Sequence, residues 1–90
     1  MKKHTKIYMD FFEYVLDDFI PCEVCGQRAV DVHHIDPRGM GGSKTKDYIE
    51  NLVGLCRNHH NECEKNKEFN QKVKSIHLAN VKRKGVGLHF

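Results

Sequence analysis

The chain has 90 residues, with 15 Lys and Arg, 12 Asp and Glu, and a formal net charge of +3. This length allows one domain with a small core, because short chains bury a smaller share of their surface than long ones. No uninterrupted apolar run approaches the roughly 20 residues of a membrane span, and Asp10 and Glu13 interrupt any export-signal core. We therefore expect a cytoplasmic protein with no membrane partner, whose four Cys bind metal rather than form disulfides.

The N-terminal segment predicts one amphipathic helix over roughly residues 5–18. Thr5 is the expected N-cap, and Pro21 ends the segment. Apolar side chains recur there at the three- and four-residue spacing of a helix face that packs on a core: Tyr8, Phe11, Phe12, Val15, Leu16 and Phe19.

The middle of the chain predicts a knuckle, a strand, a long loop and a second strand. In the knuckle Cys22-Glu-Val-Cys25-Gly26, the glycine can take a positive φ. β-branched residues over 28–35 indicate a strand, and residues 51–55 are a second, shorter candidate. Turn formers predict an irregular loop between them, from residue 36 to about 50, and a loop of that length in a small domain is usually functional.

The C-terminal part predicts two helices and a loose, basic end. Asn58 can cap a helix that begins near His59. A further helix over 67–81 places three apolar residues on one face, Phe69, Val73 and Ile76, and two glycines mark a tail after it, Gly85 and Gly87. Residues 64–90 carry seven basic against two acidic side chains, which suits a polyanion-binding surface or a solvated Lys-rich helix equally well.

Two short-spaced pairs supply ligands for a structural zinc, which takes four Cys or His side chains in a tetrahedron. Cys22 and Cys25 form the first pair. Cys56 and His59 are the natural second pair, since three-residue spacing at a helix start brings both side chains to one point. Cys63, one helical turn after His59, is the rival fourth ligand. Such a zinc contributes on the order of 10 kcal/mol to folding.

Two adjacent histidine pairs supply a second set. On a strand, His33 and His34 face opposite sides, and on a helix His60 points roughly 100° away from His59. One histidine of each pair can therefore share a site. A metal held by a strand residue and a helix residue, beside a free imidazole, suits hydrolysis of a phosphodiester, because the metal stabilises developing charge while the imidazole deprotonates water.

The stretch from Cys22 to about Glu64, nearly half of the chain, closely resembles the HNH endonuclease family. The matching parts are the knuckle, Val32-His33-His34-Ile35, the Gly41-Gly42 loop, and the run Asn51 to Arg57 followed by His60. This combination in order is highly specific, although each part alone is weak. The resemblance implies an α+β fold over residues 1–90: a small ββα-metal domain (21–66) with a treble-clef-like zinc site, between an N-terminal helix (1–20) and a basic C-terminal helix and tail (67–90).

The resemblance also implies a role for each matching position. His34 matches the general base. His33 matches the preceding position, which ligates the catalytic metal and is Asp in many members. Asn51 matches the central Asn, which braces the loop and helps orient the base, and His60 matches the final His, the second ligand of the catalytic metal. The structural zinc positions are matched by Cys22, Cys25, Cys56 and His59.

The chain departs from the family pattern at His59, where many relatives have Cys, so the roles of His59 and His60 are open to a swap. Glu64 lies where some relatives carry a third metal ligand, but it can instead pair on the surface with Lys67. Two arginines can contact phosphate or simply face solvent, Arg38 and Arg57. Three histidines are assigned no role, His4, His77 and His89.

We therefore expect a metal-dependent DNA endonuclease in which His34 activates water and Mg²⁺, Mn²⁺, Ni²⁺ or Zn²⁺ on His33 and His60 stabilises the transition state. Basic residues around Lys72, Lys74 and 82–84 would grip the DNA backbone. The alternative, a non-catalytic zinc-binding module for nucleic acid or protein, explains the cysteines and the basic segment but not the four nuclease positions. Chains of this type often resemble phage or mobile-element proteins, so a larger assembly can supply specificity.

Overall fold

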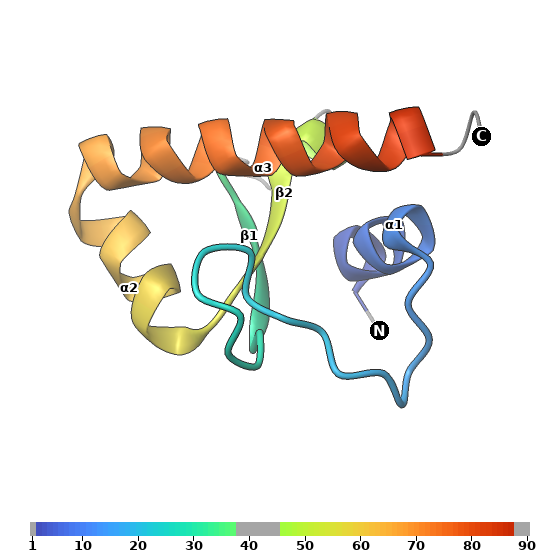
Figure 1. Ribbon diagram of the computed structural model, residues 1–90. Helices are drawn as coiled ribbons and strands as arrows, with labels where there is room; N and C mark the ends of the chain where they lie inside the picture. The colour runs from blue at the N-terminus through green and yellow to red at the C-terminus, as the bar shows by residue number, and fades with distance from the viewer. Residues whose placement is uncertain (1, 38–45, 88–90) are drawn as a thin grey trace.

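A computed structural model describes residues 2–37 and 46–87. Over these residues the fold is α+β, with three helices around a two-stranded antiparallel sheet (Figure 1). The elements in chain order are α1 (Lys3–Phe12), β1 (Asp31–His34), the 3-10 helix η2 (Ile49–Asn51), β2 (Leu52–Leu55), α2 (Arg57–Lys65) and α3 (Lys67–Gly87). In the view of Figure 1, α1 and α2 lie on either side of the sheet and α3 passes along its upper end. None of the described helices is long and apolar enough to cross a membrane.

The sheet pairs Asp31 with Leu55 at one end and His34 with Leu52 at the other. β2 is buried along its whole length, whereas β1 is half-buried throughout. Both strands are shorter than the patterns 28–35 and 51–55 predict. Arg28 pairs instead with Pro21 in an isolated bridge, and Asn51 belongs to η2.

The N-terminal helix ends earlier than its apolar spacing predicts. Glu13 takes the left-handed conformation, with φ 62°, and its N–H donates to the carbonyl of Asp10, while the N–H of Tyr14 donates to Met9. This is the hydrogen-bond pattern of a Schellman motif, which ends a helix. The prediction of a helix to residue 18 is therefore wrong, and the last three residues of the predicted apolar face are exposed: Val15, Leu16 and Phe19.

Neither predicted helix cap is present. The N-cap of α1 is Lys2, so Thr5 lies inside the helix, and the N-cap of α2 is Cys56, so Asn58 lies inside as well. The side-chain cap that does form is at the start of α3. There Asn66 Oδ1 accepts the backbone N–H groups of the second and third residues after it, Glu68 and Phe69. Asn66 thereby separates α2 from α3.

The third helix is longer than predicted and buries a different face. It continues to Gly87, so the glycines near its end do not mark a loose tail. Ile76 is 38% exposed, while Val73 and His77, four residues apart, are fully buried. The buried face therefore carries a histidine that sequence patterning left without a role. The core that α3 covers consists mainly of β2 and cysteine side chains: Cys22, Ile35, Val53, Leu55, Cys56, Cys63 and Val73.

Candidate functional site

Four side chains converge on one point between the knuckle and the start of α2. One ligand atom of each lies within 4.8 Å of all the others, in Cys22, Cys25, Cys56 and His59. The Sγ atoms of Cys25 and Cys56 are 3.8 Å apart, and His59 Nδ1 is 3.6 Å from Cys22 Sγ and 3.3 Å from Cys56 Sγ. A tetrahedral ion with bonds of about 2.3 Å to sulfur and about 2.0 Å to nitrogen separates two sulfurs by about 3.8 Å and sulfur from nitrogen by about 3.5 Å. The cluster can therefore hold a metal ion.

Backbone hydrogen bonds around the knuckle hold its two cysteines in place and act on the thiol of Cys22. Gly26 takes the predicted positive φ, at 81°, and its N–H donates to the carbonyl of Cys22, which closes the knuckle. Burial disfavours the Cys22 thiolate, but hydrogen bonds from the backbone of Cys56, Cys25 and Val24 and from the His59 ring outweigh it and lower the pKa of Cys22 to about 6. Because the thiolate is the form that binds metal, this thiol is ready to coordinate near neutral pH.

Cys63, the rival fourth ligand, lies outside the converging group of described residues. It belongs to the same apolar core cluster as Val73, and burial raises the pKa of its thiol to about 11. A buried free thiol in such a cluster packs as a small apolar side chain. The geometry therefore favours His59 over Cys63 in the cluster, because His59 faces the cysteines while the ring of His60 lies against that of His33.

His33 and His60 face each other between β1 and α2, with ring centroids 5.0 Å apart. Asn70, from α3, lies behind His33. Its Nδ2 donates to the carbonyl of Ile35 at 2.8 Å, so its Oδ1 must accept the Nε2–H of His33, 3.0 Å away. The Nδ1 lone pair of His33 then remains available to a cation. Burial lowers the pKa of His33, and the bond to Asn70 opposes this only in part, so the surroundings favour the neutral form of the ring.

His34 belongs to a separate group. Its Nε2 lies 2.7 Å from Oδ1 of Asp47, whose side chain is only 3% exposed. A carboxylate only accepts, so Nε2 carries a proton and Nδ1 is the nitrogen with a lone pair. The ring of His4, from α1, packs at 4.6 Å from the His34 ring. Sequence patterning missed both Asp47 and His4, because neither has a spacing signal that links it to β1.

Asn51 ties together the two described ends of the long loop. Its Oδ1 accepts the N–H of Asp36 at 2.7 Å, and its Nδ2 donates to the carbonyls of Asp36 at 2.9 Å and Lys46 at 3.0 Å. The backbone carbonyl of Asn51 also accepts the N–H of Ile35. These bonds hold the chain next to His34. The loop between, with Arg38 and the Gly41-Gly42 pair, lies outside the described residues, as does His89.

An open cavity of about 1240 Å³, the histidine groove, joins these groups. Because β1 has a sheet neighbour on one side only, the groove reaches both of its faces. Its lining includes His4, His33, His34, Asn51, His60 and Glu64. Lys67 and Lys74 also line it from α3, whereas Arg83 and Lys84 line a different hollow and Lys84 pairs with Glu13 at 2.6 Å. The basic residues of α3 are thus divided between two faces.

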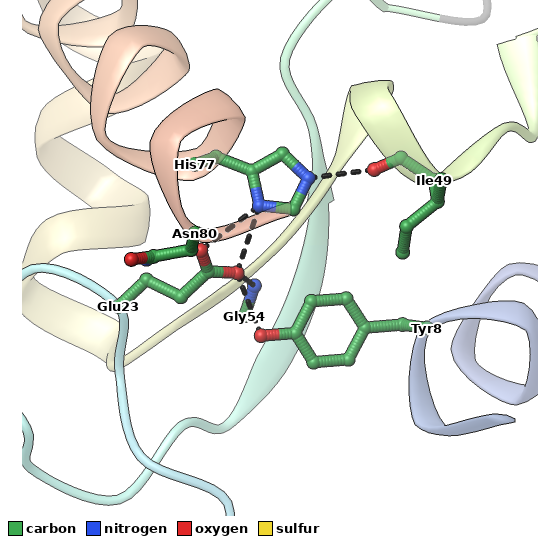
Figure 2. A network of polar contacts seen from close by, with 6 residues as sticks. All are labelled: Tyr8, Glu23, Ile49, Gly54, His77 and Asn80. Carbon is green, nitrogen blue, oxygen red and sulfur yellow. Dashed lines mark hydrogen bonds and ion pairs between the residues drawn. The ribbon is translucent and has the colours of Figure 1, made fainter. Parts of the chain in front are cut away.

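A buried polar network fixes the knuckle to the rest of the fold (Figure 2). The Glu23 carboxylate accepts from Tyr8 Oη at 2.6 Å, from His77 Nδ1 at 2.9 Å and from Asn80 Nδ2 at 2.9 Å, while Gly54 N–H lies 3.3 Å away. Burial disfavours ionised Glu23, but the bonds and charge of His77, with the other donors, outweigh it and lower the pKa of this carboxyl. Glu23 follows Cys22 directly, so the network positions the cysteine knuckle against α1, β2 and α3.

Fold and geometry together define a small α+β domain with a Cys₃His cluster able to hold a metal ion. The chain belongs to the family described as "Protein of unknown function (DUF968)", whose model matches residues 2–83. It is 48% identical over 42 residues to "Uncharacterized protein YdfU" of Escherichia coli (strain K12). That match covers 47% of this chain and 12% of the relative, so the chain spans a small fraction of that relative's length. No solved structure matches the chain significantly.

Proposed function

We propose that this chain is a metal-dependent DNA endonuclease of the HNH type, built on a structural zinc. The observation that carries the proposal is the histidine groove. The order β1, β2, α2 brings His33 and His34 from the first strand and His60 from the helix to a single open cavity, with Asn51 bracing the adjacent loop. Residues 33 and 60 are distant in sequence, yet their rings lie 5.0 Å apart.

The structural ion of this proposal is zinc in the Cys₃His cluster. Three thiolates and one imidazole are ligands that zinc prefers, and the separations of their atoms match a tetrahedron around it. The cluster ties the knuckle to the start of α2. It therefore determines how the helix that carries His60 lies against β1.

The catalytic cation would be held by His33 and His60, and when bound it supplies charge stabilisation to the phosphate and the leaving oxygen. His34 takes the proton of a water molecule on Nδ1. The water oxygen forms a bond to phosphorus, and the bond from phosphorus to the 3′-oxygen breaks. Asp47, on Nε2, holds the ring in the required tautomer and stabilises the imidazolium that forms.

The substrate of this proposal is DNA, whose phosphates would meet the three lysines of the groove, Lys2, Lys67 and Lys74. Four carboxylates line the same groove: Asp31, Asp36, Glu50 and Glu64. Lys67 and Lys74 line the same groove as His33 and His60, where they would pair with phosphates near the scissile bond. Such contacts are independent of sequence and weaken with salt. Arg83 and Lys84 face away from the groove, so the contribution to binding expected from them is smaller.

A plasmid nicking assay with Mg²⁺, Mn²⁺ or Ni²⁺ tests this function. His34→Ala should slow cleavage by about 10²- to 10⁴-fold, the usual contribution of a general base. Asn61→Ala, an exposed position on α2 outside the groove, is the control and should cut like the wild type. Zinc content and thermal unfolding must match in all three proteins. The proposal fails if the wild type cuts with none of the metals, or if His34→Ala cuts equally well.

A further inference from the structure

On the side of β1 away from the His33–His60 pair, three metal-ligating side chains meet. His4 comes from the first turn of α1, His34 from β1, and Asp47 from the segment before η2. One nitrogen of each ring and one oxygen of the carboxylate all lie within 4.8 Å of one another. We infer that His4, His34 and Asp47 form a second site for a transition-metal cation, distinct from the Cys₃His cluster and from the His33–His60 pair.

The chemistry of these donors selects the class of cation. Two imidazoles and one carboxylate suit Zn²⁺, Co²⁺, Ni²⁺ and Fe²⁺, whereas Mg²⁺ prefers oxygen ligands and retains its water. The Asp47 and His34 side chains are 3% and 15% exposed, so most of their surface is already desolvated. Binding at His34 Nε2 would move the proton of that nitrogen to Nδ1, so that the imidazole stays neutral while Nε2 and Asp47 face the ion.

The position of His4 is what distinguishes this group from a simple hydrogen-bonded pair. An Asp that only orients a histidine needs no second imidazole, yet the His4 ring lies 4.6 Å from that of His34 and lines the same groove. The groove also gives an ion a route from solvent. Alternation along β1 keeps His33 on the other face, so one cation cannot satisfy both groups.

Occupancy of this site has a consequence that rests on the proposed nuclease function. A neutral imidazole bound to metal through one nitrogen carries its proton on the other, and it then has no lone pair for water. Transition-metal ions at His34 would therefore inhibit cleavage. A reaction supported by Mg²⁺ would fall as Zn²⁺ is added, once the structural site is already full.

Binding is tested without any activity. Tag-free protein carrying one zinc is titrated with Co²⁺, followed by visible absorption and by calorimetry. His4→Ala should weaken one Co²⁺ equivalent by at least about 100-fold, more than loss of a residue that only supports a ligand usually costs. Thr5→Ala, its neighbour on α1, is the matched control and should bind like the wild type. Asp47→Asn should weaken the same equivalent, and His60→Ala should leave it intact.

Three results would overturn the site. The wild type could bind no Co²⁺ beyond the structural ion, or His4→Ala could bind Co²⁺ as the wild type does. In the third, the Co²⁺ equivalent assigned to His4 would be lost in His60→Ala instead. Inhibition is read separately, as the Zn²⁺ concentration that halves each protein's own Mg²⁺-supported cleavage. That concentration should rise at least about 100-fold in His4→Ala, in line with the binding change. Failure of the nuclease proposal removes only this last measurement, because Co²⁺ binding by His4 and His34 would remain.

Discussion

Replacing His77 by Ala should destabilise the fold more than any exposed substitution on α3. His77 Nε2 lies 2.6 Å from the carbonyl of Ile49, which only accepts, and Nδ1 lies 2.9 Å from Oε1 of Glu23. When Glu23 is ionised, both ring nitrogens must donate, so the pair is an imidazolium and a carboxylate. His77 is 0% exposed and the Glu23 side chain 7%, so neither charge is solvated by bulk water (Figure 2).

The expected size of the effect follows from that burial. Removing one partner of a buried ion pair costs about 3–5 kcal/mol, because the other charge is left without compensation. For a chain of this size, each kcal/mol lowers the melting temperature by about 4–8 °C, so the shift should be at least about 12 °C. Thermal unfolding followed by circular dichroism, with zinc in slight excess, measures it.

Two further variants make the test decisive if His77→Ala does not fold. Tyr8→Phe removes only the hydroxyl that donates to Glu23 at 2.6 Å, and it should cost about 1.5–3 kcal/mol, the range for hydrogen bonds to charged groups. Lys72→Ala, exposed on α3, should change stability by less than about 0.5 kcal/mol. If both Tyr8→Phe and His77→Ala match Lys72→Ala, the network is not a buried ion pair and the reasoning is wrong.

Four other substitutions probe the remaining contacts. Cys25→Ser should release the structural ion and unfold much of the chain, whereas Cys63→Ala should keep one equivalent of zinc by elemental analysis; loss of zinc from Cys63→Ala would restore it as a ligand. Asn70→Leu should weaken binding of the proposed catalytic cation by about 10- to 100-fold in a metal titration, while the zinc content of the Cys₃His cluster stays unchanged. Gly54→Ala would place Cβ 2.9 Å from the buried Tyr8 hydroxyl and should cost about 1–3 kcal/mol in denaturant unfolding, and an unchanged midpoint would show that Tyr8 can move.

Short-range spacing predicted the part of the site that depends on local geometry. Cys22 and Cys25 are set by a knuckle, and Cys56 and His59 by the first turn of a helix, so each pair converges whatever surrounds it. Strand alternation likewise predicts that His33 and His34 face opposite sides, and they bond to different partners, Asn70 and Asp47. Such features need only backbone regularity over a few residues.

The partners of these residues could not be predicted, because tertiary packing selects them. Asn70 is 37 residues from His33, and the polar face of α3 on which it lies looks like a solvated surface in the sequence. His77 shows the same limit. It follows Phe69 and Val73 at four-residue spacing, but a histidine adds no apolar signal that would extend the predicted buried face to it. The early end of α1 depends on the left-handed Glu13, a conformation for which the sequence offers no Gly or Asn signal.

The polar network around Glu23 is linked to the histidines on both faces of β1 through the two helices that it joins. His33 is oriented from α3 through Asn70, while His34 meets His4 of α1. A displacement of α3 would therefore disturb the contact that Asn70 makes with His33, and a displacement of α1 the contact that His4 makes with His34. The Glu23 carboxylate bonds to α1 through Tyr8 and to α3 through His77, so it holds both helices against the same knuckle. A buried ion pair is weak evidence for stability in itself, but here it joins the helix that carries Asn70 to the helix that carries His4.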